Sequence, residues 1–133
     1  NQNDSRFLRK FAVNENVFVM DEHKDAYFQQ YVISKVHAVI GMRYHCNIFA
    51  AKMHIPFIAI SYEEKMDGFL DIAGLSNYSV PVLDVSMKLL VQKFRQLEEN
   101  YDTYQDHLRE QTPKWREKAE EVFDALAKQL EKI

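Results

Sequence analysis

Four short apolar stretches punctuate the first two-thirds of the chain. Each is rich in β-branched or aromatic residues and is nearly continuous rather than alternating with polar residues. This pattern is typical of strands that are buried on both faces, as in a parallel sheet. We therefore predict strands at residues 16–20, 36–41, 56–61 and 78–83.

Segments of helical periodicity lie between these stretches. Residues 25–35, 44–53 and 64–73 each place apolar side chains on one helical face, and Gly74 provides a stop signal for the last of them. Alternating strands and helices predict right-handed βαβ units. The expected fold class is therefore α/β, with a parallel Rossmann-like sheet and flanking helices.

The last third of the chain predicts two further helices. Apolar residues recur in steps of three and four over residues 86–109, and a second stripe follows Thr112 and Pro113. Because Thr is a good N-cap and Pro suits the first helical position, we expect one helix to stop and another to begin there. We divide the chain into a partial α/β domain, residues 1–85, and a C-terminal helical pair, residues 86–133. The pair packs either on its own chain or on a second copy in a homo-oligomer.

Composition restricts the possible partners and location. The chain has 133 residues, of which 47% are hydrophobic and 28% charged, with a net charge of −3. We expect no nucleic-acid partner, since no basic cluster exceeds that of a solvated helix. The single cysteine, Cys46, suits a reducing compartment. With no signal-peptide pattern and no apolar run of about 20 residues, we expect a cytoplasmic location, with the inner face of the membrane as an alternative.

The most informative chemistry follows the second predicted strand. Ligands of parallel sheets bind beyond the carboxyl ends of the strands. There Gly41 ends a strand, and Arg43 and His45 open a helix, whose N-terminal N–H groups favour an anion. Arg43 matches phosphate or carboxylate, and His45 can donate to an anion or transfer a proton. Alternatively, Arg43 pairs with an acidic residue at another strand end, and His45 is a hydrogen-bonded core residue.

The other strand ends carry weaker candidates. Lys65 and Tyr62 follow the third predicted strand and could face the same cleft. Asp21, Glu22 and His23 follow the first strand and Asp84 follows the fourth. We expect no metal and no cofactor, because His37, His45, Cys46 and His54 lack zinc-ligand spacing and the chain has no glycine-rich phosphate loop.

These residues carry a family likeness. The motif Gly41-Met42-Arg43-Tyr44-His45, followed by a buried strand that ends in Tyr62-Glu63-Glu64-Lys65, resembles the bacterial polysaccharide pyruvyl transferases. The likeness extends over residues 36–83. Tyr44 stands where Leu is commoner in the family.

The resemblance implies the C-terminal domain of a two-Rossmann-domain, glycosyltransferase-B-like architecture. Family members are about twice as long, so we expect a missing N-terminal domain of the same protein. The implied reaction transfers a pyruvyl group from phosphoenolpyruvate to a sugar or lipid-linked saccharide of a cell-surface polysaccharide or exopolysaccharide, forming a ketal. Arg43 and His45 would be donor-binding or catalytic, and Tyr62 and Lys65 would contact substrate. We expect this fragment alone to be inactive. A nucleotide-sugar glycosyltransferase and a non-catalytic α/β interaction module remain alternatives.

Overall fold

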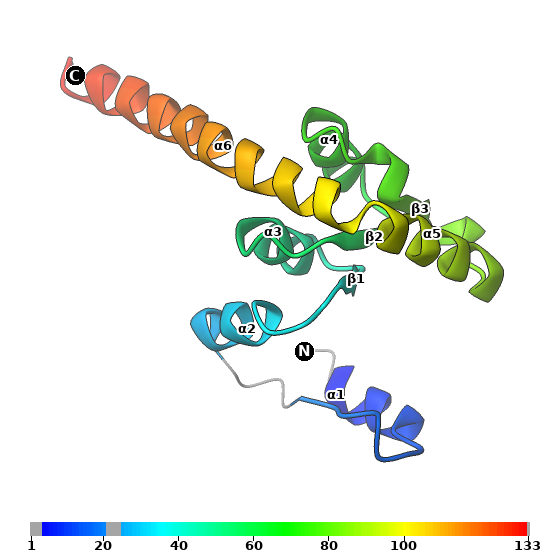
Figure 1. Cartoon of the computed structure of the whole chain (residues 1–133). Coiled ribbons are helices and arrows are strands. Elements are labelled where there is room, and N and C mark those ends of the chain that lie inside the picture. The colour runs from blue at the N-terminus through cyan, green and yellow to red at the C-terminus, as the bar shows by residue number, and fades with distance from the viewer. Residues whose placement is uncertain (1–3, 21–24, 133) are drawn as a thin grey trace.

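A computed structural model describes residues 4–20 and 25–132 (Figure 1). The strands are β1 (Val39–Gly41), β2 (Phe57–Ser61) and β3 (Ser79–Pro81). The α-helices are α1 (Asp4–Leu8), α2 (Ala26–Ile33), α3 (Tyr44–Lys52), α4 (Glu64–Ile72), α5 (Met87–Glu99) and α6 (Tyr101–Leu130). Short 3-10 turns are η1 (Arg9–Phe11), η2 (Ser76–Tyr78) and η3 (Val82–Asp84).

The three strands form one parallel sheet in the order β1-β2-β3. Gly41 is in register with Ala59, and Ser61 is in register with Pro81. α3 connects β1 to β2, and α4 connects β2 to β3, as expected of βαβ units. The predicted α/β class with a parallel sheet is therefore confirmed, and so are the last three predicted strands.

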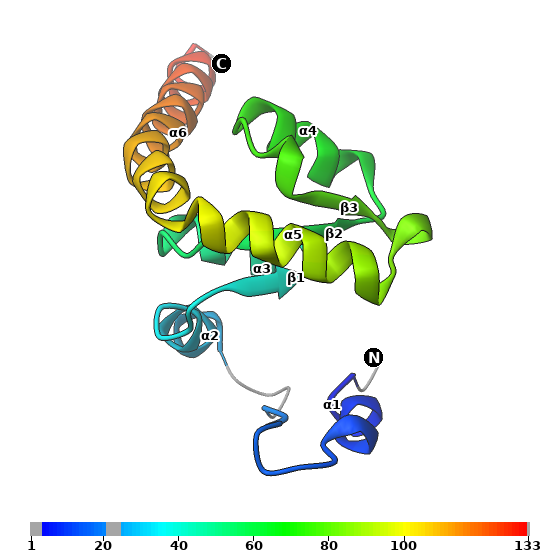
Figure 2. The ribbon, with the colours of Figure 1, turned by 45° about the vertical axis from the view of Figure 1, so that its right-hand side comes forward.

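The central strand is buried on both faces. Figure 2 shows α5 crossing in front of the strands while α3 lies behind them. Phe57, Ile58 and Ala59 of β2 are fully buried, together with Leu97 of α5 and Leu108 of α6. Because both faces are covered, this strand needs an unbroken apolar run, which explains the pattern in its sequence.

The predicted strand at residues 16–20 is wrong. Among the described residues, this segment forms no strand, and Val17 and Phe18 are 41% and 88% exposed. An apolar run becomes a strand only beside a partner strand, and in Figure 2 the segment lies apart from the sheet. Asp21, Glu22 and His23, which were expected to follow that strand, lie outside the described residues.

The predicted helix boundary at Thr112 and Pro113 is also wrong. α6 continues through Pro113, and the chain bends instead at Asn100, whose Nδ2 donates to the Gln96 carbonyl at 2.8 Å. Thr112 does not act as an N-cap, because its Oγ1 donates back to the Leu108 carbonyl at 2.6 Å. Pro113 is exposed, so water can satisfy the helix carbonyl that its missing N–H leaves without a partner.

The predicted stop signal at Gly74 is confirmed. α4 ends at Ile72, and Gly74 follows with a φ of 70°, a conformation that suits glycine. The Leu75 N–H then bonds the Leu70 carbonyl at 2.8 Å, which closes the helix end.

The two halves of α6 have different surroundings. Tyr104 and Leu108 are buried, and the Tyr104 hydroxyl donates to the Phe57 carbonyl at 2.8 Å. The first half thus packs on the sheet of its own chain. Residues 116–132 are exposed and extend away from the sheet (Figure 1). Their apolar stripe is uncovered within the described chain, and a homo-oligomer through it stays a prediction.

Among the helices formed by the described residues, none has the length and apolar character that crossing a membrane requires.

Candidate functional site

The carboxyl ends of the three strands lie along one edge of the sheet. β1 ends at Gly41, β2 at Ser61 and β3 at Pro81, in adjacent parallel positions. The loop that begins α3 therefore lies beside the loop that begins α4, since neighbouring strands are about 4.8 Å apart. Of the four predicted site residues, Arg43 and His45 belong to the first loop and helix, and Tyr62 and Lys65 belong to the second.

The N-terminus of α3 has features that favour an anion. Arg43 is the N-cap, with extended backbone angles, and its side chain makes no capping hydrogen bond to the described helix. Helix geometry leaves the N–H groups of Tyr44 and His45 without intrahelical acceptors. The first turn of α3 holds no acidic residue. By contrast, the first turn of α4 holds Glu64 and Asp67. Their negative charges already offset the positive end of that helix dipole, so the N-terminus of α3 favours an added anion more than that of α4 does.

A buried side chain that the sequence analysis did not single out sets this geometry. Asn47, on the second turn of α3, is 0% exposed, and its Nδ2 donates to the Gly41 carbonyl at 3.1 Å. The same Nδ2 lies 3.8 Å from the sulfur of Met66 on α4. A Cβ on Gly41 would lie 2.1 Å from Asn47 Oδ1, so only glycine fits there. Asn47 thereby ties the end of β1 to α3 and α4. An amide within a mostly apolar helix, six residues after the glycine, was the available signal.

The pKa of Tyr62 is affected by charged residues of both loops. Its hydroxyl donates a hydrogen bond to the Glu63 carboxylate, which raises the pKa of Tyr62. The positive charge of Arg43 acts in the opposite direction on the same pKa, which indicates that the two side chains lie near each other. Tyr62 is half exposed and stays protonated near neutral pH, so it can serve as a hydrogen-bond donor at the strand ends.

Lys65 and His45 both contact the Tyr44 ring. The Lys65 Nζ is 4.1 Å from the centroid of the Tyr44 ring. The His45 and Tyr44 rings meet edge to face, 5.9 Å apart, and His45 is exposed. The structure thus gathers a lysine and a histidine beside the residue that directly follows Arg43. Their roles in substrate binding or catalysis stay predictions.

The comparison with protein families bears on this group. Residues 2–64 match the family model described as polysaccharide pyruvyl transferase. This segment carries the polysaccharide pyruvyl transferase sequence pattern. The expected resemblance is confirmed there, and that family is a family of transferases. The match contains Gly41, Arg43, His45 and Tyr62 and ends one residue before Lys65. Comparisons with the curated proteins and with the solved structures found no match.

Other residues with reactive or metal-ligating side chains do not join this group. Burial raises the pKa of the Cys46 thiol, which disfavours a nucleophilic thiolate. His37 lies at the other end of β1, bonded to Glu98 at 2.6 Å and stacked on Tyr101. Asp84 is exposed after β3. Within the described ranges, no group of three or more His, Cys, Asp or Glu residues could hold a metal ion.

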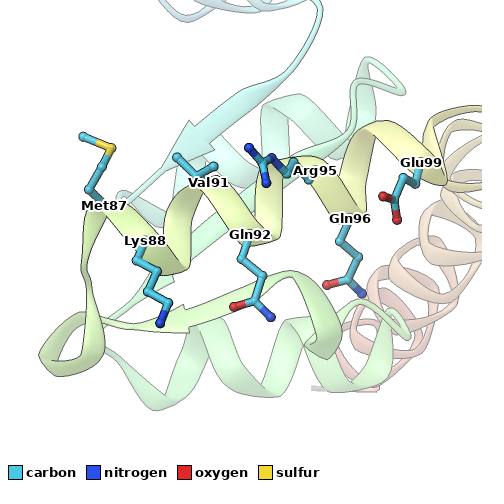
Figure 3. A pocket seen from close by; sticks show the side chains of 7 residues that line it. All are labelled: Met87, Lys88, Val91, Gln92, Arg95, Gln96 and Glu99. Carbon is cyan, nitrogen blue, oxygen red and sulfur yellow. The ribbon is translucent and has the colours of Figure 1, made fainter.

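An open surface hollow lies elsewhere, outside the segment that matches the pyruvyl transferase family. It follows α5, and all of its lining side chains come from that one helix (Figure 3). Figure 3 shows Lys88, Gln92 and Gln96 on one side of α5 and Met87, Val91 and Arg95 on the other. Because side chains of only one helix line it, this hollow lacks the convergent groups of a binding cleft.

Proposed function

We propose that the protein transfers a pyruvyl group from phosphoenolpyruvate to a sugar of a cell-surface polysaccharide. The observation that carries this proposal is the arrangement at the pyruvyl transferase motif. Arg43 is the N-cap of a helix whose first turn has no acidic residue, and Lys65 lies over the ring of the next residue, Tyr44. Phosphoenolpyruvate has a phosphate and a carboxylate, so a donor site needs two cationic elements, and this edge of the sheet supplies both.

Arg43 and the α3 N-terminus hold one anionic group of the donor, and Lys65 holds the other. The guanidinium can bind either group through two parallel N–H donors, while the ammonium acts as a point charge.

His45 moves the protons of the reaction. It protonates the donor methylene carbon and then accepts a proton from a sugar hydroxyl, whose oxygen bonds to the central donor carbon. The bond to the phosphate oxygen breaks, and a second hydroxyl of the sugar adds to the same carbon. One hydroxyl proton is finally found on the methyl carbon and the other on the released phosphate, leaving a cyclic ketal. Tyr62, protonated and half exposed, turns its hydroxyl from the Glu63 carboxylate to donate to the donor or to the acceptor.

The acceptor site is proposed to lie on an N-terminal domain of the same protein. In a glycosyltransferase-B-like architecture, that domain would close over the carboxyl ends of these strands. The described chain would then supply the donor half of the cleft and be inactive alone, with the reaction placed in the cytoplasm or at the inner face of the membrane.

Calorimetric titration tests the donor assignment. The intact protein would be titrated with phosphoenolpyruvate, with inorganic phosphate and with a nucleotide-sugar panel. We expect Arg43→Ala to abolish phosphoenolpyruvate binding. Arg95→Ala, which removes an exposed arginine of α5, is the matched control and should bind as the wild type does. Binding of a nucleotide-sugar alone would make the protein a glycosyltransferase, and binding of none would favour an interaction module.

The role of His45 has its own test. His45→Gln should retain phosphoenolpyruvate binding and lose at least 100-fold in kcat, since general acid–base catalysis contributes about 10²–10⁴-fold. Full turnover by this variant would remove His45 from proton transfer while leaving the donor assignment intact.

A further inference from the structure

An ordered row of four side chains connects α6 to the site. Trp115 of α6 meets Phe69 of α4 edge to face, with ring centroids 5.7 Å apart and planes at 70°. Phe69 meets Tyr44 of α3 in the same way, at 6.2 Å and 73°. Tyr44 in turn carries Lys65 over its ring at 4.1 Å. The row therefore runs through three helices and ends at the cationic group proposed to bind donor.

Trp115 occupies a boundary position on α6. One turn before it, Thr112 Oγ1 lies 3.4 Å from the Ala51 carbonyl at the end of α3. Trp115 is itself partly buried against the core, whereas residues 116–132 are all exposed. Within the described chain, Trp115 is thus the last α6 side chain that packs on the α/β layer.

The packing of Trp115 also bears on the position of the Lys65 ammonium group. Lysine is a flexible four-carbon chain, so an exposed lysine has no fixed position unless something holds it. The face of the Tyr44 ring attracts the ammonium group and places it beside the α3 N-terminus. Phe69 packs edge to face with the Tyr44 ring, and Trp115 packs edge to face with Phe69, so these two contacts favour the ring position that Lys65 meets.

We propose that Trp115 is a positioning residue of the anion site. Acting through Phe69 and Tyr44, it fixes the Lys65 ammonium beside the N-cap Arg43. The C-terminal helix, which lies outside the segment matching the pyruvyl transferase family, thereby acts on the donor half of the cleft. The binding consequence rests on the proposed function, whereas the placement of Lys65 does not.

The placement is tested by NMR of protein labelled with ¹³C at the lysine ε-carbons. The Tyr44 ring current should shift the Lys65 ε-methylene signal upfield, and Lys65→Arg assigns that signal by its loss. We expect the shift to disappear in Tyr44→Leu and in Trp115→Ala, and to persist in Trp115→Phe. Phe123→Ala is the matched control, because it removes an exposed aromatic residue from the same helix. A Lys65 signal that stays shifted in a folded Trp115→Ala variant would overturn the proposal.

Binding provides the second arm of the test. Loss of one exposed cation–π contact corresponds to about a two- to fivefold change in affinity. Trp115→Ala should weaken phosphoenolpyruvate binding by that factor in the presence of Lys65 and leave it unchanged in a Lys65→Ala background. An equal loss in both backgrounds would show a general packing effect and contradict the proposal.

The test can still be decided if Trp115→Ala does not fold or if the wild-type protein does not bind phosphoenolpyruvate. If Trp115→Ala does not fold, as judged by circular dichroism, Phe69→Leu interrupts the same row while retaining an apolar side chain. If wild-type protein does not bind phosphoenolpyruvate, the donor assignment fails, and the Lys65 chemical shift still decides whether Trp115 positions the lysine.

Discussion

The contact between Gly41 and Asn47 allows a quantitative test of how the site is built. A Cβ on Gly41 would lie 2.1 Å from Asn47 Oδ1 and 2.9 Å from its Cγ, well below any normal contact. Asn47 is fully buried, so its carboxamide cannot swing into solvent. Gly41→Ala must therefore displace the carboxamide and break its hydrogen bond to the Gly41 carbonyl.

The expected cost follows from these contacts. Overpacking a buried position costs about 1–3 kcal/mol. Leaving a buried amide without its partner costs about 1–3 kcal/mol more. We therefore expect Gly41→Ala to lower the free energy of unfolding by about 2–6 kcal/mol, a large part of the ~5–15 kcal/mol of a typical domain. Asn47→Ala removes the hydrogen bond and leaves a small cavity, at a cost of about 1–3 kcal/mol.

The double variant distinguishes a steric conflict with the Asn47 carboxamide from a general loss of stability. The three atoms nearest to the added Cβ all belong to the Asn47 carboxamide, which Asn47→Ala deletes. The double variant should therefore be about as stable as Asn47→Ala alone, so the coupling energy should cancel the cost of Gly41→Ala and be about −2 to −6 kcal/mol.

Urea denaturation followed by circular dichroism measures all four proteins of the cycle. Gly68→Ala is the matched control, since an added Cβ meets no atom within 4 Å there and Gly68 lies inside α4. It should raise the free energy of unfolding by about 0.5–1 kcal/mol. Additive losses for Gly41→Ala and Asn47→Ala would refute the assignment of the steric conflict.

Three other predictions concern stability. The buried Tyr104 hydroxyl donates to the Phe57 carbonyl, and burial raises the pKa of Tyr104 far above the usual 10.0. The contribution of Tyr104 to stability should be constant below pH 10 and fall above it. Tyr104→Phe should lose about 1 kcal/mol at pH 7 and show a smaller fall in stability at alkaline pH. His54 has a φ of 58°, and its pKa is lowered from 6.5, mainly by burial and also by the positive charge of Arg109. His54→Gly should raise the free energy of unfolding by up to about 1 kcal/mol and reduce the loss of stability below pH 6.5. A less stable variant would contradict this prediction. Removal of the exposed residues 117–132 should change the free energy of unfolding by less than about 1 kcal/mol in a urea titration, and a larger loss would indicate that a second copy covers the stripe.

The chemistry at the start of α3 could be located from the sequence because its signals are local. A buried run ending in Gly41, followed by Arg43 and a helical pattern, predicts a strand, a turn and a helix N-terminus without knowledge of distant residues. The structure has this order of elements. The pairing of Lys65 with Tyr44 was not predictable in this way, because it depends on how α3 and α4 pack across neighbouring strands.

The failures have a common physical cause. Residues 16–20 have the composition of a strand, but strand formation needs a neighbouring strand that a local pattern cannot supply. Thr112 and Pro113 have the composition of a helix start, but packing of Leu108 before them and Trp115 after them holds α6 together across the proline. In both cases tertiary contacts outweighed the local preference.

The sequence by itself thus determined the α/β class, the three paired strands, the helices between them and the residues that follow the strand ends. These features depend on periodicity and on stop signals within a few residues, which the chain carries locally. Only the tertiary structure decided that Asn47 ties Gly41 to two helices, that the bend falls at Asn100 and that Trp115 packs on Phe69. These contacts join residues that are separated along the chain, and close packing selects among the many pairs that the sequence alone would allow.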